Sequence, residues 1–275
     1  MPKDTTVATW DKKAEMINKL FLIAGPCVVE NEKTPSDIAK HVAALCDELD
    51  ITFIFKASYK KANRTRLDSF TGIDKTEALQ IIQETGKSVG ATTITDIHES
   101  HEVDEVAKYV DHLQIPAFLC RQTDLLLAAG HSGKGVNIKK GQFVSPEAMK
   151  FPLEKVQSTG NKNEWICERG FTHGYDRLVV DAASIARMKQ HGAPVVMDCT
   201  HSLQQPNKAE GISGGNPDMI ETVALSAIAT GADGLFIETH PDPANALSDG
   251  QSMLPMDKLE DILRKVVKVR KALAS

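Results

Sequence analysis

The sequence predicts an α/β protein in which eight strand–helix units close into one (β/α)8 (TIM) barrel. Two observations support this prediction. Short apolar runs alternate with amphipathic segments from about residue 19 to the end of the chain, and we count eight such units. No break in composition separates one unit from the next. Alternation of this kind is typical of a parallel sheet, and eight units favour closure into a barrel.

The expected strands are the apolar runs at 20–24, 51–55, 91–94, 112–115, 135–138, 164–167, 194–198 and 234–237. Amphipathic segments between them predict the helices. In the first helix, which opens at Thr34-Pro35, Ile38, Val42 and Leu45 recur at helical spacing. The remaining helices are expected over 75–88, over 103–110, around 125–127, from the cap Ser145-Pro146, over 182–190, over 216–230 and from about 257.

An open, doubly wound sheet is the structural alternative. The sequence offers it no support, because it contains neither a glycine-rich dinucleotide fingerprint nor a P-loop. Residues 1–18 are polar and show no clear period, so we interpret them as an N-terminal extension. The segment 19–275 is then a single catalytic barrel.

Composition excludes several classes of function. The chain has 275 residues and a formal net charge of −5, which argues against a general nucleic-acid partner. No apolar run is long enough to span a bilayer and no signal segment opens the chain, so we expect no membrane partner. The cysteines are odd in number, widely spread and without a CxxC pair, which favours a reduced, cytoplasmic protein.

The stretch Lys56–Arg66 carries five cations in eleven residues and follows a buried strand. Ammonium and guanidinium groups both suit phosphate. A phosphate or carboxylate site and an ordinary solvated basic loop are both open interpretations of this stretch alone.

The positions that follow the expected strands give a stronger signal. In such barrels the chemistry lies at the carboxyl ends of the strands, and these ends carry a polar or reactive side chain almost everywhere. The residues are Cys27, Lys56, Lys61, Asp96, Gln114, Lys139, Arg169, His201 and Glu238. Closure of the barrel would bring them to one mouth. Its cations, with Arg64, suit ligands that bear several phosphate or carboxylate groups.

Some of these residues are of metal-ligand type. Cys27, His201 and Glu238 follow or end strands one, seven and eight, which adjoin in a closed barrel, and Asp249 in the last loop is a fourth candidate. A thiolate, an imidazole and two carboxylates fit a divalent ion such as zinc, iron or manganese. Taken singly, each of these residues also has an ordinary structural explanation.

The same residues carry a resemblance to a known family. The chain is similar to 3-deoxy-D-manno-octulosonate 8-phosphate synthases from about residue 20 to the end, in order and without a large gap. The motifs lie at 24–30, 56–65, 95–99, 114–124, 167–170, 198–206 and 240–250. Thr65 is a small departure, since serine is usual there and the hydroxyl is kept.

The resemblance implies a transferase of lipopolysaccharide biosynthesis, usually a homotetramer. Its reaction condenses phosphoenolpyruvate with D-arabinose 5-phosphate and water, and yields the eight-carbon product and inorganic phosphate. By position, the residues expected to hold phosphoenolpyruvate are Lys56, Lys61, Gln114, Lys139 and Arg169. Asn63, Arg64 and Thr65 are expected to bind the sugar phosphate, and Asp96 its hydroxyls. Gln204 is expected to be a further substrate-binding residue.

The resemblance also assigns a branch. One branch of the family has asparagine where this chain has Cys27 and needs no metal. The other has cysteine, and its metal ligands match Cys27, His201, Glu238 and Asp249. We therefore expect a metal-dependent enzyme, with Lys56, Lys61, Asp96, His201 and Cys27 in catalysis.

Two alternatives stay open at this point. The related 3-deoxy-arabino-heptulosonate 7-phosphate synthases use erythrose 4-phosphate and typically have Lys-Pro-Arg-Thr where this chain has Lys61-Ala62-Asn63-Arg64-Thr65. The second alternative is a barrel that binds a sugar phosphate without catalysis.

Overall fold

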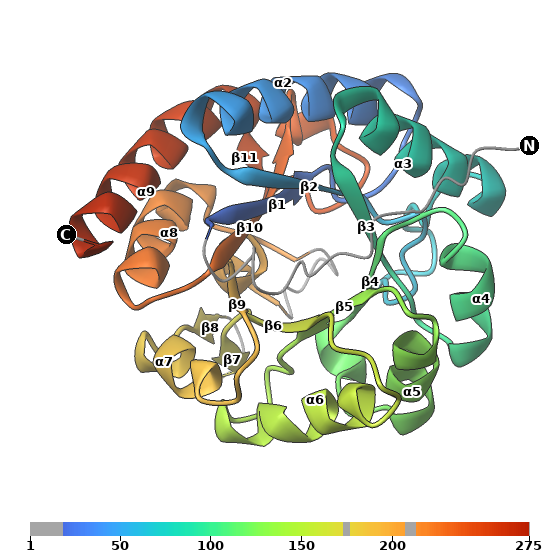
Figure 1. Cartoon of the computed structure of the whole chain (residues 1–275). Coiled ribbons are helices and arrows are strands. Elements are labelled where there is room, and N and C mark those ends of the chain that lie inside the picture. Colours follow the sequence, from blue (N-terminus) through green and yellow to red (C-terminus); the bar gives the residue numbers. More distant parts are fainter. Residues whose placement is uncertain (1–18, 173–176, 207–212, 275) are drawn as a thin grey trace, which may run out of the picture.

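The computed structural model describes residues 19–172, 177–206 and 213–274. Eight parallel strands form a closed barrel (Figure 1): β1 (Phe21–Gly25), β2 (Thr52–Lys56), β3 (Thr92–Asp96), β4 (His112–Ile115), β5 (Gly135–Lys139), β6 (Glu164–Glu168), β9 (Val195–Asp198) and β10 (Gly234–His240). The barrel closes where β1 pairs with β10, with Phe21 opposite Gly234. This closure confirms the predicted fold and rules out the open sheet.

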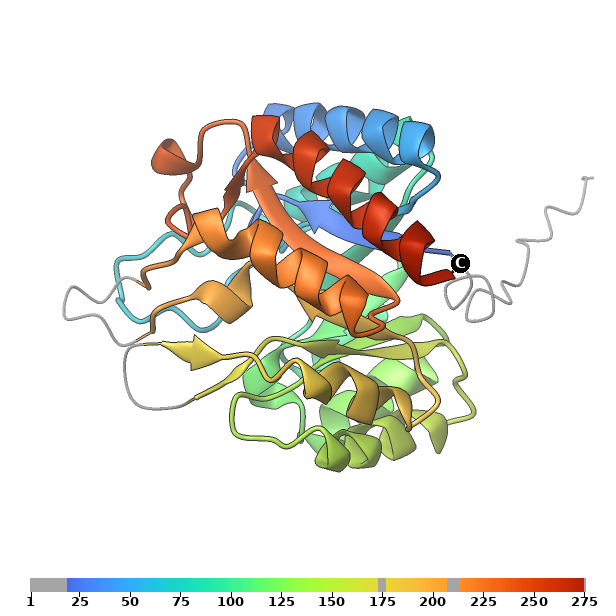
Figure 2. The same cartoon turned by 90° about the vertical axis from the view of Figure 1, so that its left-hand side faces the viewer.

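The helices surround the barrel (Figure 1): α2 (Lys33–Leu49), α3 (Lys75–Val89), α4 (Val103–Val106), α5 (Thr123–His131), α6 (Lys150–Gln157), α7 (Ala183–Lys189), α8 (Ile220–Ala229) and α9 (Leu259–Ala274). Figure 2 shows α8 and α9 side by side along the outside of β10. Capping residues determine where some of these helices begin and end. The Asp74 side chain accepts the N–H groups of Thr76 and Glu77 at 3.0 Å, and Gly90 ends α3 with φ of 66°.

Three helix predictions were wrong in their bounds. The helix expected over 216–230 opens with a 3-10 turn, Pro217–Met219, and α8 begins only at Ile220. The third helix was expected to reach Val110, but α4 ends at Val106. Val110 is buried in the turn before β4, so its apolar character reflects packing against the core and not helical periodicity. The helix expected from Ser145 begins later. Ser145 Oγ accepts the N–H of Ala148 at 3.3 Å and starts a 3-10 turn, after which α6 begins at Lys150.

Three short strands were not predicted from the sequence. β7 (Phe171–Thr172) and β8 (Leu178–Val179) form an antiparallel hairpin after β6. β11 (Leu254–Pro255) pairs with the end of β10. Each has two residues, too few for a period-2 pattern to be recognised. The proposed N-terminal extension, 1–18, lies outside the described residues.

Two apolar layers hold the fold together. The larger lies between the barrel and its helices. The smaller fills the barrel interior with Phe21, Ile23, Ile54, Ile94, Trp165, Cys167, Val196 and Phe236. Phe21 and Trp165 meet edge to face with ring centroids 6.5 Å apart. The barrel is therefore a packed core and not a pore, and ligands are confined to its mouth.

In residues 19–172, 177–206 and 213–274, we find no helix with the length and apolar character needed to cross a membrane.

Candidate active site

A cavity of about 910 Å³ opens at the carboxyl ends of the strands. Its lining includes Lys56, Lys61, Asn63, Arg64, Thr65, Asp96, Gln114, Lys139, Arg169, His201, Gln204, Glu238 and Asp249. The structure thus brings every predicted substrate-binding residue to one place, although they are spread along the chain from Lys56 to Gln204. Their individual roles remain predictions. Cys27 is buried beside the cavity and does not line it.

The ends of β2, β3 and β4 form one hydrogen-bonded group. Asp96 and Gln114 lie in register on neighbouring strands, and the amide of Gln114 donates to the Asp96 carboxylate. Ser58 donates to the other oxygen of Asp96, and Lys56 Nζ lies 3.4 Å from it. Burial by itself would raise the pKa of Asp96, but the ammonium groups of Lys56 and Lys61 outweigh it and lower that pKa well below its usual range.

On the opposite side, Asp198 organises two functional residues. Its Oδ2 accepts from Lys139 Nζ at 2.6 Å and from His201 Nδ1 at 2.8 Å. Its Oδ1 accepts the backbone N–H groups of Thr200 and His201 at 3.1 and 2.8 Å. Burial opposes ionisation of Asp198, but His201 and Lys139 hold its pKa well below the usual range. Asp198 is completely buried, so it acts through these two residues.

Phe236 of β10 lies beneath three of these side chains. The ammonium of Lys139 lies 3.9 Å from the ring centroid and that of Lys56 lies 5.7 Å from it. The His201 ring is tilted against it at 5.6 Å. An aromatic face attracts a desolvated cation, so Phe236 supports both ammonium groups at the base of the mouth.

Arg169 follows β6 and is only 6% exposed. Its Nη2 donates to the side-chain oxygen of Gln204 at 2.9 Å. Its buried Nη1 has no hydrogen-bond partner among the described residues. Burial lowers the pKa of Arg169, with Asp198 opposing that effect. A buried guanidinium with a spare donor that faces a cavity is suited to an anionic ligand.

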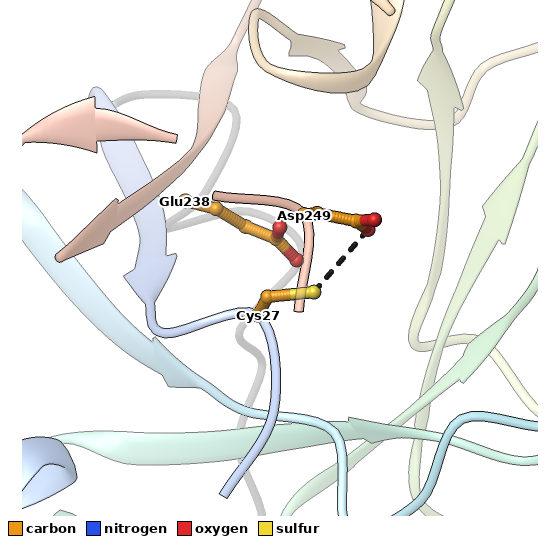
Figure 3. Close-up of side chains that lie close together, drawn as sticks. All are labelled: Cys27, Glu238 and Asp249. Carbon is orange, nitrogen blue, oxygen red and sulfur yellow. Dashed lines mark hydrogen bonds between the residues drawn. The ribbon is translucent and has the colours of Figure 1, made fainter. Parts of the chain in front are cut away.

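Cys27, Glu238 and Asp249 form a compact cluster beside this cavity (Figure 3). One potential ligand atom from each lies within 4.8 Å of the others. The thiol of Cys27 donates to Asp249 Oδ2 at 3.3 Å. Two residues before Cys27, Gly25 lets β1 pass close to the end of β2, because a Cβ there would lie 1.9 Å from the carbonyl oxygen of Lys56. His201 is not part of this cluster but adjoins it, with Nε2 3.4 Å from Glu238 Oε2.

The cluster places a thiol beside two carboxylates. Burial raises the pKa of the Cys27 thiol, and the carboxylates of Asp249 and Glu238 raise it further. Glu238 is 1% exposed, and neither of its carboxylate oxygens makes a hydrogen bond within the described part of the chain. The basic groups that face it are His201, whose Nε2 lies 3.4 Å away, Lys61, and Lys56, whose Nζ lies 3.9 Å away.

The basic loop reaches across the cavity. Arg64 donates to Ser248 and, at 3.4 Å, to Asp249 in the loop after β10. Asn63 and Thr65 are exposed on the same loop, where a ligand can reach them. The stretch 56–66 is thus largely part of the site, although Arg66 pairs with Asp68 in solvent.

Sequence reasoning missed Asp198, Phe236, Ser58 and Ser248. Asp198 was placed in the seventh strand without a role. The spacing of three residues between Asp198 and His201 was an available signal, because a turn after the strand returns the histidine to the carboxylate. Phe236 has no such signal, because an apolar residue inside a strand is expected to be core.

A closed barrel with a cation-lined cavity at its carboxyl edge defines a class of barrel proteins that bind small phosphorylated or carboxylated molecules. Comparison with known proteins narrows the class. The model of the DAHP synthetase I family matches residues 12–275. A 2-dehydro-3-deoxyphosphooctonate aldolase from Desulfatibacillum aliphaticivorans is 47% identical over 253 residues, covering 92% of this chain and 93% of that protein.

Further proteins of the same name are similarly close. The one from Acidithiobacillus ferrooxidans is 46% identical, with 92% of this chain and 90% of that protein covered. The one from Legionella pneumophila is 44% identical, with 91% and 92% covered. The chain belongs to the DAHP synthetase I family, in its group of 2-dehydro-3-deoxyphosphooctonate aldolases, also called 3-deoxy-D-manno-octulosonate 8-phosphate synthases. This confirms the resemblance found in the sequence.

Proposed function

We propose that this chain condenses phosphoenolpyruvate with D-arabinose 5-phosphate and water, to give 3-deoxy-D-manno-octulosonate 8-phosphate and inorganic phosphate. The observation that carries the proposal is the cavity. Cations from four separate loops and strand ends line it, in a chain that shares 44–47% identity with the aldolases named above. The two substrates together bring two phosphates and a carboxylate, and fixed cations compensate these charges.

The residues divide between the two substrates. Lys56, Lys61, Lys139 and Arg169 surround the inner part of the cavity, and the spare Nη1 donor of Arg169 suits the phosphate or carboxylate of phosphoenolpyruvate. The outer loop with Asn63, Arg64 and Thr65 suits the sugar phosphate. In this arrangement the enol carbon of one substrate faces the aldehyde of the other.

The reaction forms one carbon–carbon bond and exchanges one carbon–oxygen bond for another. The enol carbon attacks the aldehyde, whose oxygen takes up a proton. Water adds at the neighbouring carbon and gives up its protons, and the bond from that carbon to the phosphate oxygen breaks, so inorganic phosphate leaves and a ketone remains. Positioning two reactants in this way contributes about 7–11 kcal/mol to such reactions. Asp198 fixes the tautomer of His201, because a carboxylate only accepts, so Nδ1 carries the proton and Nε2 is directed to Glu238.

We further propose that Cys27, His201, Glu238 and Asp249 hold a divalent transition-metal ion. The fit rests on the donor set and on charge: three ligand atoms lie within 4.8 Å of one another, and Glu238 carries buried oxygens without hydrogen bonds among the described residues. When bound, such an ion would polarise the sugar aldehyde or orient the attacking water. The residues of the chain bind and orient the two substrates, and His201 carries a proton on Nδ1.

We also propose that the protein works as a homotetramer in the cytoplasm. Large apolar side chains are exposed on loops that follow the strands, namely Leu67, Phe118 and Phe143. Exposed apolar groups of this kind favour association between subunits. Light scattering of the purified protein tests the subunit count, and a monomer at micromolar concentration would contradict it.

The decisive test is release of inorganic phosphate from phosphoenolpyruvate with each aldose phosphate. Release with D-arabinose 5-phosphate and little with erythrose 4-phosphate is expected. A preference for erythrose 4-phosphate would assign the chain to the sister activity. Binding of either substrate without release would leave a non-catalytic barrel.

A further inference from the structure

A second lysine lies directly after Lys139 and has no part in the chemistry proposed above. Lys140 is 1% exposed and does not line the cavity. Its ammonium lies 3.2 Å from the carboxylate of Glu168, which is also 1% exposed. A fully buried ion pair contributes little net stability compared with apolar residues of the same size, so its presence calls for another explanation.

The pair holds both backbone polar groups of one residue, Gly170. Lys140 Nζ donates to the carbonyl oxygen of Gly170 at 3.3 Å, and Glu168 Oε1 accepts the N–H of the same residue at 2.6 Å. Lys140 also donates to the carbonyl of Val144 at 3.3 Å. Three acceptors therefore use the full donor capacity of the buried ammonium, and the loop after β5 is joined to the turn after β6.

The residue between Glu168 and Gly170 is Arg169. Its backbone is thus held on both sides by partners of Lys140. Gly170 has φ of 79°, in the left-handed region, and turns the chain sharply out of β6. The buried pair is therefore one of the contacts that fix the backbone from which the guanidinium enters the cavity, and the hydrogen bond from Arg169 to Gln204 holds the guanidinium itself.

The backbone next to the pair carries the second cation, Lys139. Lys139 lies opposite Cys167 in the β5–β6 register, and the N–H of Lys140 continues that ladder by donating to the Cys167 carbonyl at 2.8 Å. Lys139 and Arg169, which face the cavity, are therefore each adjacent in sequence to one member of the buried pair.

We propose that Lys140 and Glu168 are positioning residues that hold Arg169, and with it Lys139, in place for the anionic groups of phosphoenolpyruvate. The proposal rests on the proposed function only in the identity of the ligand. Because Asn63, Arg64 and Thr65 lie on a different loop, the pair acts on one substrate and not on the other.

The test replaces Lys140 by methionine, which keeps most of the volume and removes the charge. Calorimetry with phosphoenolpyruvate alone is expected to show a Kd raised roughly tenfold or more, as misplaced ligand contacts produce. The KM for D-arabinose 5-phosphate should change much less than the KM for phosphoenolpyruvate. A crystal structure of the variant should show the guanidinium of Arg169 displaced.

A control variant separates an effect on the position of Arg169 from a general loss of protein stability. Lys189 donates to the carbonyl of Gly231 at 2.9 Å and to Asp233 at 2.7 Å, before β10 begins and therefore at the opposite end of the barrel. Lys189→Met should lower the melting temperature without changing the Kd of phosphoenolpyruvate. If Lys140→Met does not fold, Glu168→Gln serves instead, since it retains an acceptor for the Gly170 N–H, and the same shift is expected in reduced size.

Three results would overturn the inference. They are an unchanged Kd in both variants, equal increases in the KM of both substrates, and an unmoved Arg169 in the variant structure. Failure of the proposed function looks different, because the unmodified protein would then release no phosphate with D-arabinose 5-phosphate. In that case the position of Arg169 in the variant crystal still decides the inference.

Discussion

Lys139 and His201 share one oxygen atom, Oδ2 of Asp198, at 2.6 and 2.8 Å. The two residues are 62 positions apart in sequence. A single buried carboxylate therefore holds both the Lys139 ammonium and the His201 imidazole, which adjoins the cluster of Cys27, Glu238 and Asp249. The alignment of the two sides of the site depends on this one group.

Replacing Asp198 by asparagine should lower kcat/KM by roughly 10- to 100-fold, the usual effect of losing a carboxylate that orients a functional histidine. The amide lacks the charge that holds Lys139, and its NH₂ cannot accept from His201. Steady-state phosphate release measures the effect.

The matched control is Asp233→Asn. Asp233 is also a buried carboxylate, bonded to Lys189 at 2.7 Å and to the N–H of Val195 at 2.8 Å, but it precedes β10. The Asp233→Asn variant should be less stable than the unmodified protein. At a temperature where it is folded, its kinetic constants should be unchanged. Equal kinetic losses in the two variants would show that Asp198 has no special role.

Phe236→Leu should raise the KM for phosphoenolpyruvate about tenfold. Leucine preserves an apolar base but removes the ring face that lies 3.9 Å from the Lys139 ammonium, an interaction worth about 2 kcal/mol when desolvated. Phe21→Leu is the control, because Phe21 belongs to the same interior layer and packs on Trp165. If both variants bind phosphoenolpyruvate equally well, the ring acts only as core packing.

Cys27→Asn should bind less metal while it keeps its fold. The substitution removes the thiol from the cluster with Glu238 and Asp249, and the amide is a weaker ligand for transition metals. Metal content by mass spectrometry, together with circular dichroism, measures both properties. Cys46→Ala, at a buried thiol on α2 outside the cluster, is expected to retain full metal content. Full metal in Cys27→Asn would refute the assignment.

Removal of metal with a chelator tests whether the activity depends on the proposed ion. Phosphate release should fall on removal of metal and return on addition of a divalent ion. Activity that persists after verified removal would leave the reaction intact and remove Cys27, His201, Glu238 and Asp249 from the set of required ligands.

Glu102 predicts a pH dependence of stability. Burial by itself raises its pKa, but hydrogen bonds from Lys60 and from the N–H of His98 lower it to about 2. A carboxylate whose pKa is lower in the folded state stabilises the protein above its ordinary pKa, and that stabilisation is lost as the pH falls towards 2.

Glu102→Gln should therefore reduce the free energy of unfolding by about 1.5–3 kcal/mol at pH 7, the range for hydrogen bonds to charged groups. The difference from the unmodified protein should narrow as the pH falls below about 4. Urea titrations at several pH values measure it. Glu105→Gln, at a half-exposed pair with Lys75, should change stability by well under this amount. A constant difference at all pH values would contradict the charge argument.

Several elements were predictable from the sequence for a plain physical reason. Strands such as 52–56 and 135–139 are short apolar runs that end in a lysine, and parallel strands buried on both faces require such runs. Because all strands point the same way, their final residues gather at one edge. The candidate site residues could therefore be identified from the strand ends alone, before any interatomic distance was known.

The turn after β6 was less predictable. Lys140 and Glu168 look in the sequence like ordinary charged residues at strand ends, where Lys139 and Arg169 also lie. The local twist of the strand and Gly170 decide which of two adjacent side chains faces the cavity and which is buried. A pattern of residue types does not contain that information.

The sequence by itself determined the barrel, the edge at which its chemistry lies, the family and the residue types of the site, because these depend on periodicity and on local order along the chain. Only the tertiary structure decided that Asp198 joins Lys139 to His201, that Cys27 meets Asp249, and that Lys140 grips the backbone beside Arg169. These contacts join residues 30 to 222 positions apart. Their distances are set by barrel closure and packing, which no single segment specifies.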